Sequence, residues 1–285
     1  MKTAIAILFL ITIFFQTQAQ EIIQPSKNYK GGEMIFAPSY GLKLEIPSHW
    51  NGYLSRGTEI FTVSNDTTLE ATALYFVNET SLPSIQSNWE KGFELATELS
   101  IELLDTVTEK DGVLSAPIHT TGSNPYKGYL LAKCGEYNYC VTVLMYTPHK
   151  FYPPYEGKLK PLIDQLSFYK PRPQTNDFDW KKALTNKMIF NSARGENGSK
   201  EENRIWLYYD GTFKSKTQRT GVFRGQAGKY HGTKKGSYII QNAKNENPAT
   251  LELQFKKQPS LTLTLTIKDN QYYLNSDVIY FSEIK

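Results

Sequence analysis

Regular alternation of apolar and polar residues is the feature that most constrains this chain of 285 residues. In residues 259–281, PSLTLTLTIKDNQYYLNSDVIYF, apolar residues alternate with threonines up to Asp269 and Asn270, and the alternation resumes beyond them. Successive side chains of a β-strand point to opposite faces, so this pattern predicts two half-buried antiparallel strands joined by a tight turn at Asp269-Asn270. Such a turn pairs Leu265 with Leu274 on the apolar face.

Strand-like segments of the same kind fill the rest of the C-terminal part. In RIWLYYDGTFKSK, a loop with Gly211 in the left-handed region places Leu207 opposite Phe213. NKMIF, GSYIIQ, ATLELQF and VIYF add further strands. About eight short antiparallel strands in ~100 residues favour a small up-and-down barrel, which removes its own edges by closing. Its interior is either filled by side chains or holds one small ligand, and we favour a filled core because inward positions are rich in large apolar residues.

The first residues resemble a secretory signal. Lys2 precedes an apolar run over residues 4–15, and Ala19 is a small residue suited to cleavage. The run is shorter than the ~20 residues that a membrane-spanning helix needs, and no cysteine lies at the cleavage point for a lipid anchor. We therefore expect a signal peptide over residues 1–19 and a mature protein that is periplasmic or secreted.

The two cysteines, Cys134 and Cys140, flank GEYNY between two alternating segments. They thus fall near facing positions of a predicted hairpin, and an oxidising compartment favours a disulfide between them. Two free, half-buried thiols are the alternative. A metal site would need further ligands, and no histidine lies close in sequence. We expect neither a metal nor a cofactor.

A polar segment with two prolines, YKPRPQTNDFDW, predicts a domain boundary near Gln174. Residues 20–173 then form one domain and residues 174–285 a second. The charge divides at nearly the same place, because residues 176–285 carry 18 Lys and Arg against 11 Asp and Glu, whereas the rest of the chain carries 14 against 17. A basic C-terminal half therefore follows a slightly acidic N-terminal half.

Residues 20–173 show strand patterns interrupted by two helical ones. In residues 81–99, SLPSIQSNWEKGFELATEL, apolar residues recur at spacings of three and four from Leu82 to Ala96, which predicts one helix that starts near Ser81. A second helical stripe lies in residues 157–168, GKLKPLIDQLSF. The order of strands and helices predicts an α+β domain, an antiparallel sheet with helices packed on it.

Two family resemblances follow from these motifs. The opening strand GLKLEIPSHW, a helix that carries Trp89, long antiparallel strands and a closing helix resemble the PsbP/Mog1-like superfamily over residues 33–169. The basic half resembles the small lipocalin-like barrels of secreted bacterial proteins, with DFDWKKALTNKMIF as first strand, LYYDGTF as a hairpin, and GSYII with Tyr238 where Trp is commoner. The leader, ending in TQAQ, is similar to those of Bacteroidetes. These resemblances imply folds, and the photosystem and GTPase-partner roles of the superfamily do not carry over.

Sequence motifs for catalysis are not recognisable. The histidines, His49, His119, His149 and His231, lie far apart, and none has the spacing of a two-histidine metal motif. No nucleophile elbow or phosphate-binding glycine loop is present in the sequence. We therefore expect a non-enzymatic protein.

One stretch is strongly basic, since no acidic residue lies between residues 214 and 235. It predicts a rim that binds an anionic partner. The candidate residues are Lys214, Lys216, Arg219, Arg224, Lys229, His231, Lys234 and Lys235. Solvated loops whose charges serve solubility are the alternative. Acidic polysaccharide and lipopolysaccharide phosphate rank above nucleic acid, which the expected compartment disfavours.

An aromatic loop in residues 146–158, YTPHKFYPPYEGK, is the second candidate surface. Phe151, Tyr152 and Tyr155 with two prolines suit stacking on a sugar or on a partner chain. Aromatic side chains tucked against the end of the sheet are the alternative.

Together these surfaces predict a secreted or periplasmic binding protein for a glycan, another anionic envelope component or a protein partner. Two other functions stay open. One is a hydrolase or isomerase with its site in the cleft between domains, and the other is a structural or assembly subunit with a filled barrel.

Overall fold

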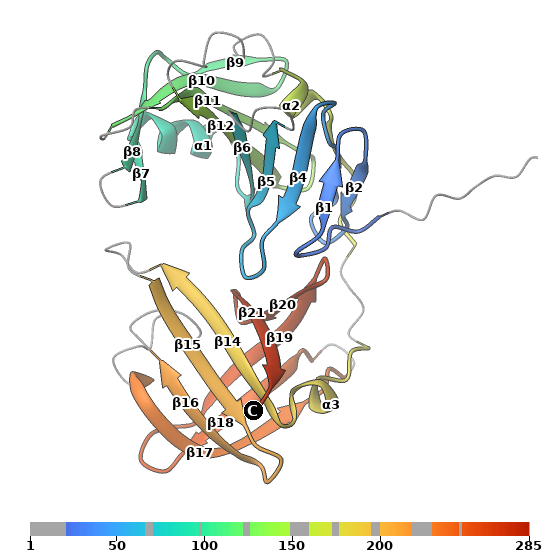
Figure 1. Ribbon diagram of the computed structural model, residues 1–285, viewed down its shortest axis with the longest axis vertical. Coiled ribbons are helices and arrows are strands. Elements are labelled where there is room, and N and C mark those ends of the chain that lie inside the picture. Colours follow the sequence, from blue (N-terminus) through green and yellow to red (C-terminus); the bar gives the residue numbers. More distant parts are fainter. Residues whose placement is uncertain are drawn as a thin grey trace, which may run out of the picture.

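The computed structural model describes residues 21–65, 71–96, 99–121, 126–148, 160–172, 177–194, 200–217, 230–244 and 247–284. Within these ranges the chain is mostly β, with a ten-stranded sheet, a three-stranded sheet, a closed barrel and three short helices (Figure 1). The predicted signal peptide, residues 1–19, and the predicted boundary at Gln174 lie outside the described residues.

The ten-stranded sheet is antiparallel, in the order β1-β4-β5-β6-β12-β11-β10-β8-β7, with β9 paired to β10. Its strands are β1 (Asn28–Lys30), β4 (Trp50–Leu54), β5 (Phe61–Asn65), β6 (Thr72–Glu79), β7 (Phe93–Ala96), β8 (Leu99–Leu103), β9 (Thr108–Lys110), β10 (Val113–Thr120), β11 (Tyr126–Cys134) and β12 (Tyr139–Pro148). The three-stranded sheet contains β2 (Met34–Ala37), β3 (Leu42–Glu45) and β13 (Leu166–Phe168).

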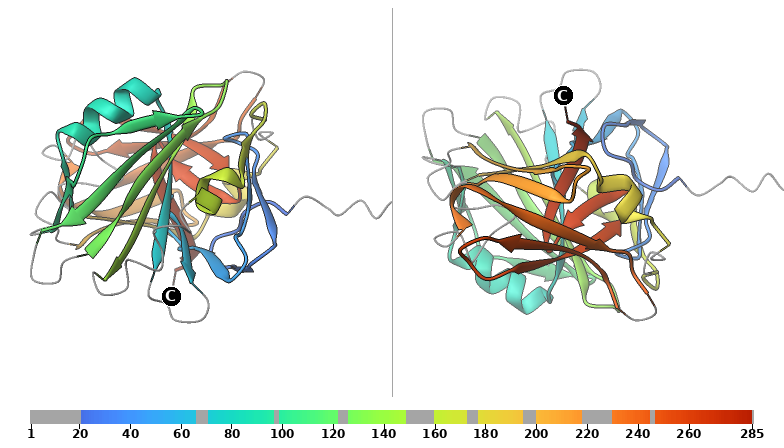
Figure 2. Two further views of the ribbon diagram at one scale, coloured as in Figure 1. Left: turned by 90° about the horizontal axis from the view of Figure 1, so that it is seen from above. Right: turned by 90° about the horizontal axis from the view of Figure 1, so that it is seen from below.

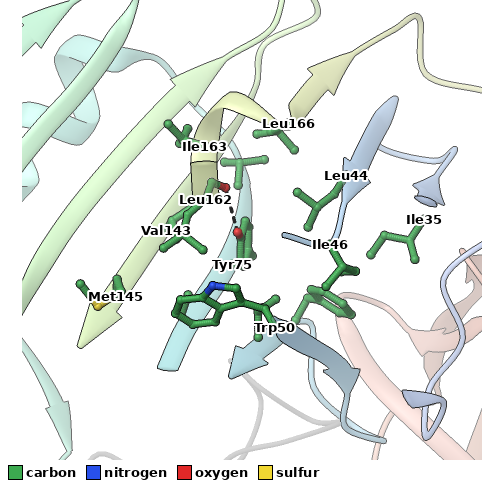
Figure 3. Close-up of a cluster of buried hydrophobic side chains, with 14 of the residues drawn as sticks. Ile35, Leu44, Ile46, Trp50, Tyr75, Val143, Met145, Leu162, Ile163 and Leu166 are labelled. Carbon is green, nitrogen blue, oxygen red and sulfur yellow. Dashed lines mark hydrogen bonds between the residues drawn. The ribbon is translucent and has the colours of Figure 1, made fainter. Parts of the chain in front are cut away.

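Different elements cover the two faces of the ten-stranded sheet. The helix α1 (Leu82–Glu90) buries Ile85 and Trp89 against one face, together with residues of β8, β10, β11 and β12. The three-stranded sheet and the helix α2 (Lys160–Asp164) cover the other face, where the Tyr75 hydroxyl donates to the Leu162 carbonyl at 2.8 Å (Figure 3). Figure 2 shows α1 and α2 at separate places on the sheet.

The N-terminal helices are shorter than the sequence predicts. α1 begins after Ser81 as expected, but it ends at Glu90, because Gly92 turns the chain with φ +68° and donates its N–H to the Trp89 carbonyl. Phe93–Ala96 is strand β7, so the helical stripe predicted beyond Trp89 was wrong. α2 spans five residues and strand β13 follows it at Leu166. The predicted antiparallel sheet is therefore present, whereas the helices of the predicted α+β domain are shorter than expected, so that class is only loosely supported.

The predicted eight-stranded antiparallel barrel is confirmed, and pairing of its first strand with its last closes it. Its strands are β14 (Lys187–Arg194), β15 (Lys200–Leu207), β16 (Thr212–Thr217), β17 (Gly232–Gln241), β18 (Ala249–Phe255), β19 (Leu261–Lys268), β20 (Gln271–Leu274) and β21 (Asp277–Glu283). The predicted registers are confirmed too, since Leu265 pairs with Leu274 and Leu207 with Phe213. Gly211 has the expected left-handed conformation, with φ +79°.

A short helix precedes the barrel where a strand was predicted. In DFDWKKAL, α3 (Trp180–Leu184) begins at Asp179, whose carboxylate accepts the Lys182 backbone N–H at 3.1 Å. The first barrel strand therefore starts only at Lys187. An N-cap aspartate satisfies one of the otherwise unpaired N–H groups of the first turn, which explains the helix.

The barrel core is packed with side chains. Alternate leucines of β18 and β19 are buried together with Trp180 and Leu184 of α3. Aromatic rings close around this core, since Trp180 lies 5.8 Å from Tyr272, and Tyr230 lies 4.9 Å from Phe255, between ring centroids. Figure 2 shows α3 beside the barrel strands, on the side away from the ten-stranded sheet.

The hairpin of β19 and β20 joins the barrel to the N-terminal part of the chain (Figure 1). At its turn, Asp269 is 2% exposed and accepts the Ser39 backbone N–H, and the Asn270 side-chain amide donates to the Ile23 carbonyl at 3.2 Å. Tyr273 points out of the barrel yet is buried, and the Lys268 ammonium lies 5.5 Å from its ring centroid. Hairpin turns are ordinarily exposed, and here Asn270 is exposed while the side chain of Asp269 is buried where the hairpin docks on the N-terminal part.

Candidate functional site

The structure describes part of the predicted basic rim. Lys214 and Lys216 lie on β16, Lys234 and Lys235 lie on β17, and exposed His231 precedes β17. The other candidates, Arg219, Arg224 and Lys229 of the rim and Phe151, Tyr152 and Tyr155 of the aromatic loop, lie outside the described residues.

Strand alternation divides the predicted rim. Lys235 is exposed on the outer face of the barrel and pairs with Lys214 of β16. Lys234 belongs to the opposite set of β17 side chains and pairs with Ser215, which is fully buried. Because adjacent residues of a strand point to opposite faces, Lys234 and Lys235 cannot form one continuous surface. The two lysines thus lie on different faces of the barrel, and the basic rim stays a prediction.

The neighbouring strand β15 extends the outer basic surface. Trp206 pairs with Lys214 and Arg204 pairs with Lys216, so side chains of three adjacent strands lie in two rows. The first row holds Trp206, Lys214 and Lys235, and the second begins with Arg204 and Lys216. We call these five side chains, Arg204, Trp206, Lys214, Lys216 and Lys235, the basic face.

Two residues of the basic face, Lys214 and Arg204, make contacts that restrict their side chains. The Lys214 ammonium lies 5.3 Å from the centroid of the Trp206 ring, within the range of a cation–π interaction. The Arg204 guanidinium donates to a Glu202 carboxylate oxygen at 2.8 Å and lies 5.5 Å from the Phe190 ring centroid. Arg204 is therefore partly neutralised and anchored, whereas Lys214 is held over an aromatic surface.

The charge arrangement is unfavourable for the barrel by itself. Lys214 and Lys235 stand directly opposite each other on paired strands, a placement that costs a few tenths of a kcal/mol or more. Among the described residues, no carboxylate forms an ion pair with Lys214, Lys216 or Lys235. The Lys214 and Lys235 ammonium groups therefore repel each other across the paired strands.

Sequence reasoning missed Trp206 and Arg204. Trp206 lies in the alternating segment RIWLYY, where a tryptophan would be assigned to the core, and its outward direction depends on the register with β14 and β16. Arg204 lies ten residues before the basic stretch in sequence. Pairing of β15 with β16 alone brings both residues beside the lysines.

A pocket of about 460 Å³ lies between the barrel and the N-terminal part. Its lining includes Arg56, Gln271, Tyr272, Tyr280 and Phe281. No aspartate, glutamate, histidine or cysteine is among the described residues that line it.

The disulfide between Cys134 and Cys140 is confirmed, and the two residues face each other across β11 and β12. In the described ranges, no group of three or more histidine, cysteine, aspartate or glutamate residues is placed to hold a metal ion. His119 instead lies 3.4 Å from the Glu102 carboxylate. Among the helices of the described residues, none is both long and apolar enough to cross a membrane.

No protein-family profile and no curated protein matches the sequence. Structures similar to part of the chain include the solution structure of cyanobacterial PsbP (CyanoP) from Synechocystis, at 11% sequence identity and a TM-score of 0.35, with 50% of this chain and 92% of that chain covered. A crystal structure from Bacteroides thetaiotaomicron gives 12% identity and a TM-score of 0.33 over 50% of this chain and 51% of that one. TM-scores this low do not establish a common fold, so the PsbP/Mog1-like and lipocalin-like assignments stay predictions.

Proposed function

We propose that this chain is a secreted or periplasmic, non-enzymatic binding protein, and that the basic face of its barrel binds an acidic polysaccharide. The observation that carries the proposal is the row of Trp206, Lys214 and Lys235, in which an aromatic ring and two opposed cations share one outward surface. The disulfide is in keeping with an oxidising compartment.

The shape of the surface favours a polymer over a small molecule. Three adjacent strands present the basic face on the outside of a closed barrel, with neighbouring strands ~4.8 Å apart. A small ligand usually binds in a concave site that buries most of its surface, which such an exterior does not offer. A chain of acidic sugars can place several carboxylates or sulfates along the two rows, while the face of one sugar ring packs against Trp206.

Titration calorimetry with polygalacturonate tests the proposal, with neutral dextran as comparison. The triple variant Lys214→Glu, Lys216→Glu, Lys235→Glu should bind polygalacturonate at least about tenfold more weakly, a loss of ~1.4 kcal/mol or more. Binding by the unaltered protein should weaken as salt is raised, since salt screens exposed charges beyond a Debye length of ~10 Å at 0.1 M.

A matched control makes the same change in net charge at three lysines outside the basic face. Lys30, Lys110 and Lys244 are exposed and lie outside the basic face, so their replacement by glutamate should leave most of the affinity. Equal losses in both triple variants would show a general charge effect, and equal binding of dextran would show that charge is not recognised. Either result contradicts the proposal. Lipopolysaccharide and acidic proteins, titrated in the same way, identify a partner of another kind.

A further inference from the structure

A groove of about 700 Å³ lies beside α1 on the ten-stranded sheet, on a part of the molecule that the basic face does not reach. α1 packs mainly over β11, and the neighbouring surface of β6 and β12 forms the floor of the groove. The central row of this floor is Phe76 of β6 directly paired with Thr142 of β12. The next row pairs Leu144 with Leu130 of β11.

The floor and the rim differ in chemistry. Buried Leu130 and Leu144 belong to the floor, buried Ile85 and Trp89 of α1 line its side, and the half-buried Phe76 ring offers an apolar surface to the groove. The rim is polar and comes from two directions. Asn78, Glu79 and Thr80 lie at the end of β6, and Asn88 and Lys91 lie on and after α1.

The rim is also electrically balanced. Among the described residues that line it, the rim has one carboxylate, Glu79, and one ammonium, Lys91, together with the carboxamides of Asn78 and Asn88. A carboxamide both donates and accepts hydrogen bonds. The rim therefore favours neither an anion nor a cation, in contrast with the basic face.

We propose that this groove binds one neutral sugar ring of a saccharide, with an apolar face of the ring against Phe76 and its hydroxyls on Asn78, Asn88 and Thr142. A pyranose carries C–H groups on its face and hydroxyls at its edge, the same division that the groove shows between floor and rim. A purely apolar ligand would leave the two carboxamides and the threonine hydroxyl without partners, which costs binding energy. The volume lies within the ~300–1,000 Å³ typical of small-molecule sites.

Two features hold the groove in shape. The Cys134–Cys140 disulfide lies on the same face of the sheet and in the same row as Asn78, because Cys140 pairs with both Cys134 and Asn78. Gly92, in its left-handed conformation, ends α1 at the border of the groove. Phe76 and Asn78 thus sit on β6, which pairs with the cross-linked strand β12, and Asn88 sits on a helix anchored by buried Ile85 and Trp89. Such preorganisation lowers the entropic cost of binding.

Saturation-transfer-difference NMR with neutral monosaccharides tests the proposal, since single sugar rings bind weakly. The probes are glucose, galactose, mannose and N-acetylglucosamine, each at millimolar concentration, with glucuronate and leucine as chemically different comparisons. At least one neutral sugar should receive saturation, strongest at the ring protons of one face. The variant Asn78→Ala, Asn88→Ala should lower its affinity about tenfold or more.

Matched variants separate recognition from folding. Asn51→Ala changes another exposed strand asparagine, and Ser87→Ala changes the exposed helix position beside Asn88, so both should keep the signal. Phe76→Ala should abolish the signal. If that variant does not fold, the double variant Asn78→Ala, Asn88→Ala still tests the proposal. Three outcomes overturn the proposal: no saturation of any neutral sugar, an unchanged signal in the double variant, or stronger saturation of glucuronate or leucine. None of these outcomes depends on polygalacturonate binding to the basic face.

Discussion

The backbone N–H of Ser39 donates a hydrogen bond to Oδ1 of Asp269 across 3.0 Å and joins residues 230 positions apart. Asp269 lies at the turn of a barrel hairpin, and Ser39 lies between two strands of the three-stranded sheet. The bond therefore fastens the barrel to the N-terminal part through a carboxylate that is almost fully buried.

The buried carboxylate makes stability depend on pH. Burial raises the pKa of Asp269 above its ordinary value of 3.8, and the hydrogen bonds from Ser39 oppose this shift only in part. A carboxyl group with a raised pKa holds its proton more tightly in the folded protein, so the free energy of unfolding falls as pH rises from 3.8 through the raised pKa. Asp269→Asn keeps an acceptor oxygen and cannot ionise. We expect it to remove this decrease in urea unfolding measured across the acidic range.

Two further variants check this explanation. Asp269→Ala leaves the Ser39 N–H without its acceptor and should lower the free energy of unfolding by about 1–3 kcal/mol. Asp210 is the matched control, because hydrogen bonds from Thr212 lower the pKa of its exposed carboxyl. Asp210→Asn should therefore remove a contribution of the opposite sign, one that is present above pH 3.8 and lost as pH falls. Identical pH profiles for Asp269→Asn and the unaltered protein would refute the assignment.

Two tryptophans of the C-terminal half should respond differently to removal. Trp180 is 2% exposed and packs edge-on against Phe178, with 4.8 Å between ring centroids. Trp180→Ala should lower the free energy of unfolding by about 3–5 kcal/mol, because it opens a cavity in the barrel core. Trp206→Ala, on the basic face, should cost about 1 kcal/mol and should mainly weaken polygalacturonate binding. Urea denaturation of both variants makes the comparison, and equal losses of stability would contradict the outward placement of Trp206.

Loss of the disulfide should destabilise the N-terminal part moderately. Cys134 and Cys140 are six residues apart, so the bond closes a short loop and restricts the unfolded chain by about 2 kcal/mol. Cys134→Ala, Cys140→Ala should show this decrease in urea denaturation, and a reducing agent should produce a similar one in the unaltered protein. The same variant should weaken sugar saturation in the groove, because the row that holds Asn78 is no longer cross-linked. An unchanged urea midpoint would show that neighbouring strands alone fix this row.

The sequence predicted those features that depend on local patterns. Alternation and turn residues were sufficient for the barrel, its hairpin at Asp269-Asn270 and the cysteine pairing. The helix that starts at Ser81 was extended too far, because its apolar stripe continues through Gly92 into a strand whose residues happen to keep helical spacing. The local turn signal of one glycine outweighed the periodicity.

The candidate sites depend on contacts between distant segments and were only partly predictable. The basic stretch was recognised, but alternation within β17 removed Lys234 from it and pairing with β15 added Trp206. The groove could not be foreseen, since α1 and three strands contribute to it and no local motif marks their juxtaposition. The burial of Asp269 was equally hidden, because turn chemistry indicates a bend and says nothing of what covers it.

The docked hairpin lies beside the place where the chain leaves the N-terminal part. Arg172 donates its backbone N–H to the Pro38 carbonyl, one residue before the Ser39 N–H that binds Asp269. The backbone thus leaves the N-terminal part next to the hydrogen bond that holds the hairpin, and both links lie at residues 38 and 39. Loss of the Asp269 carboxylate therefore removes a hydrogen bond at the same corner where the backbone leaves the N-terminal part, so the covalent and non-covalent links between the two parts are concentrated in one small region.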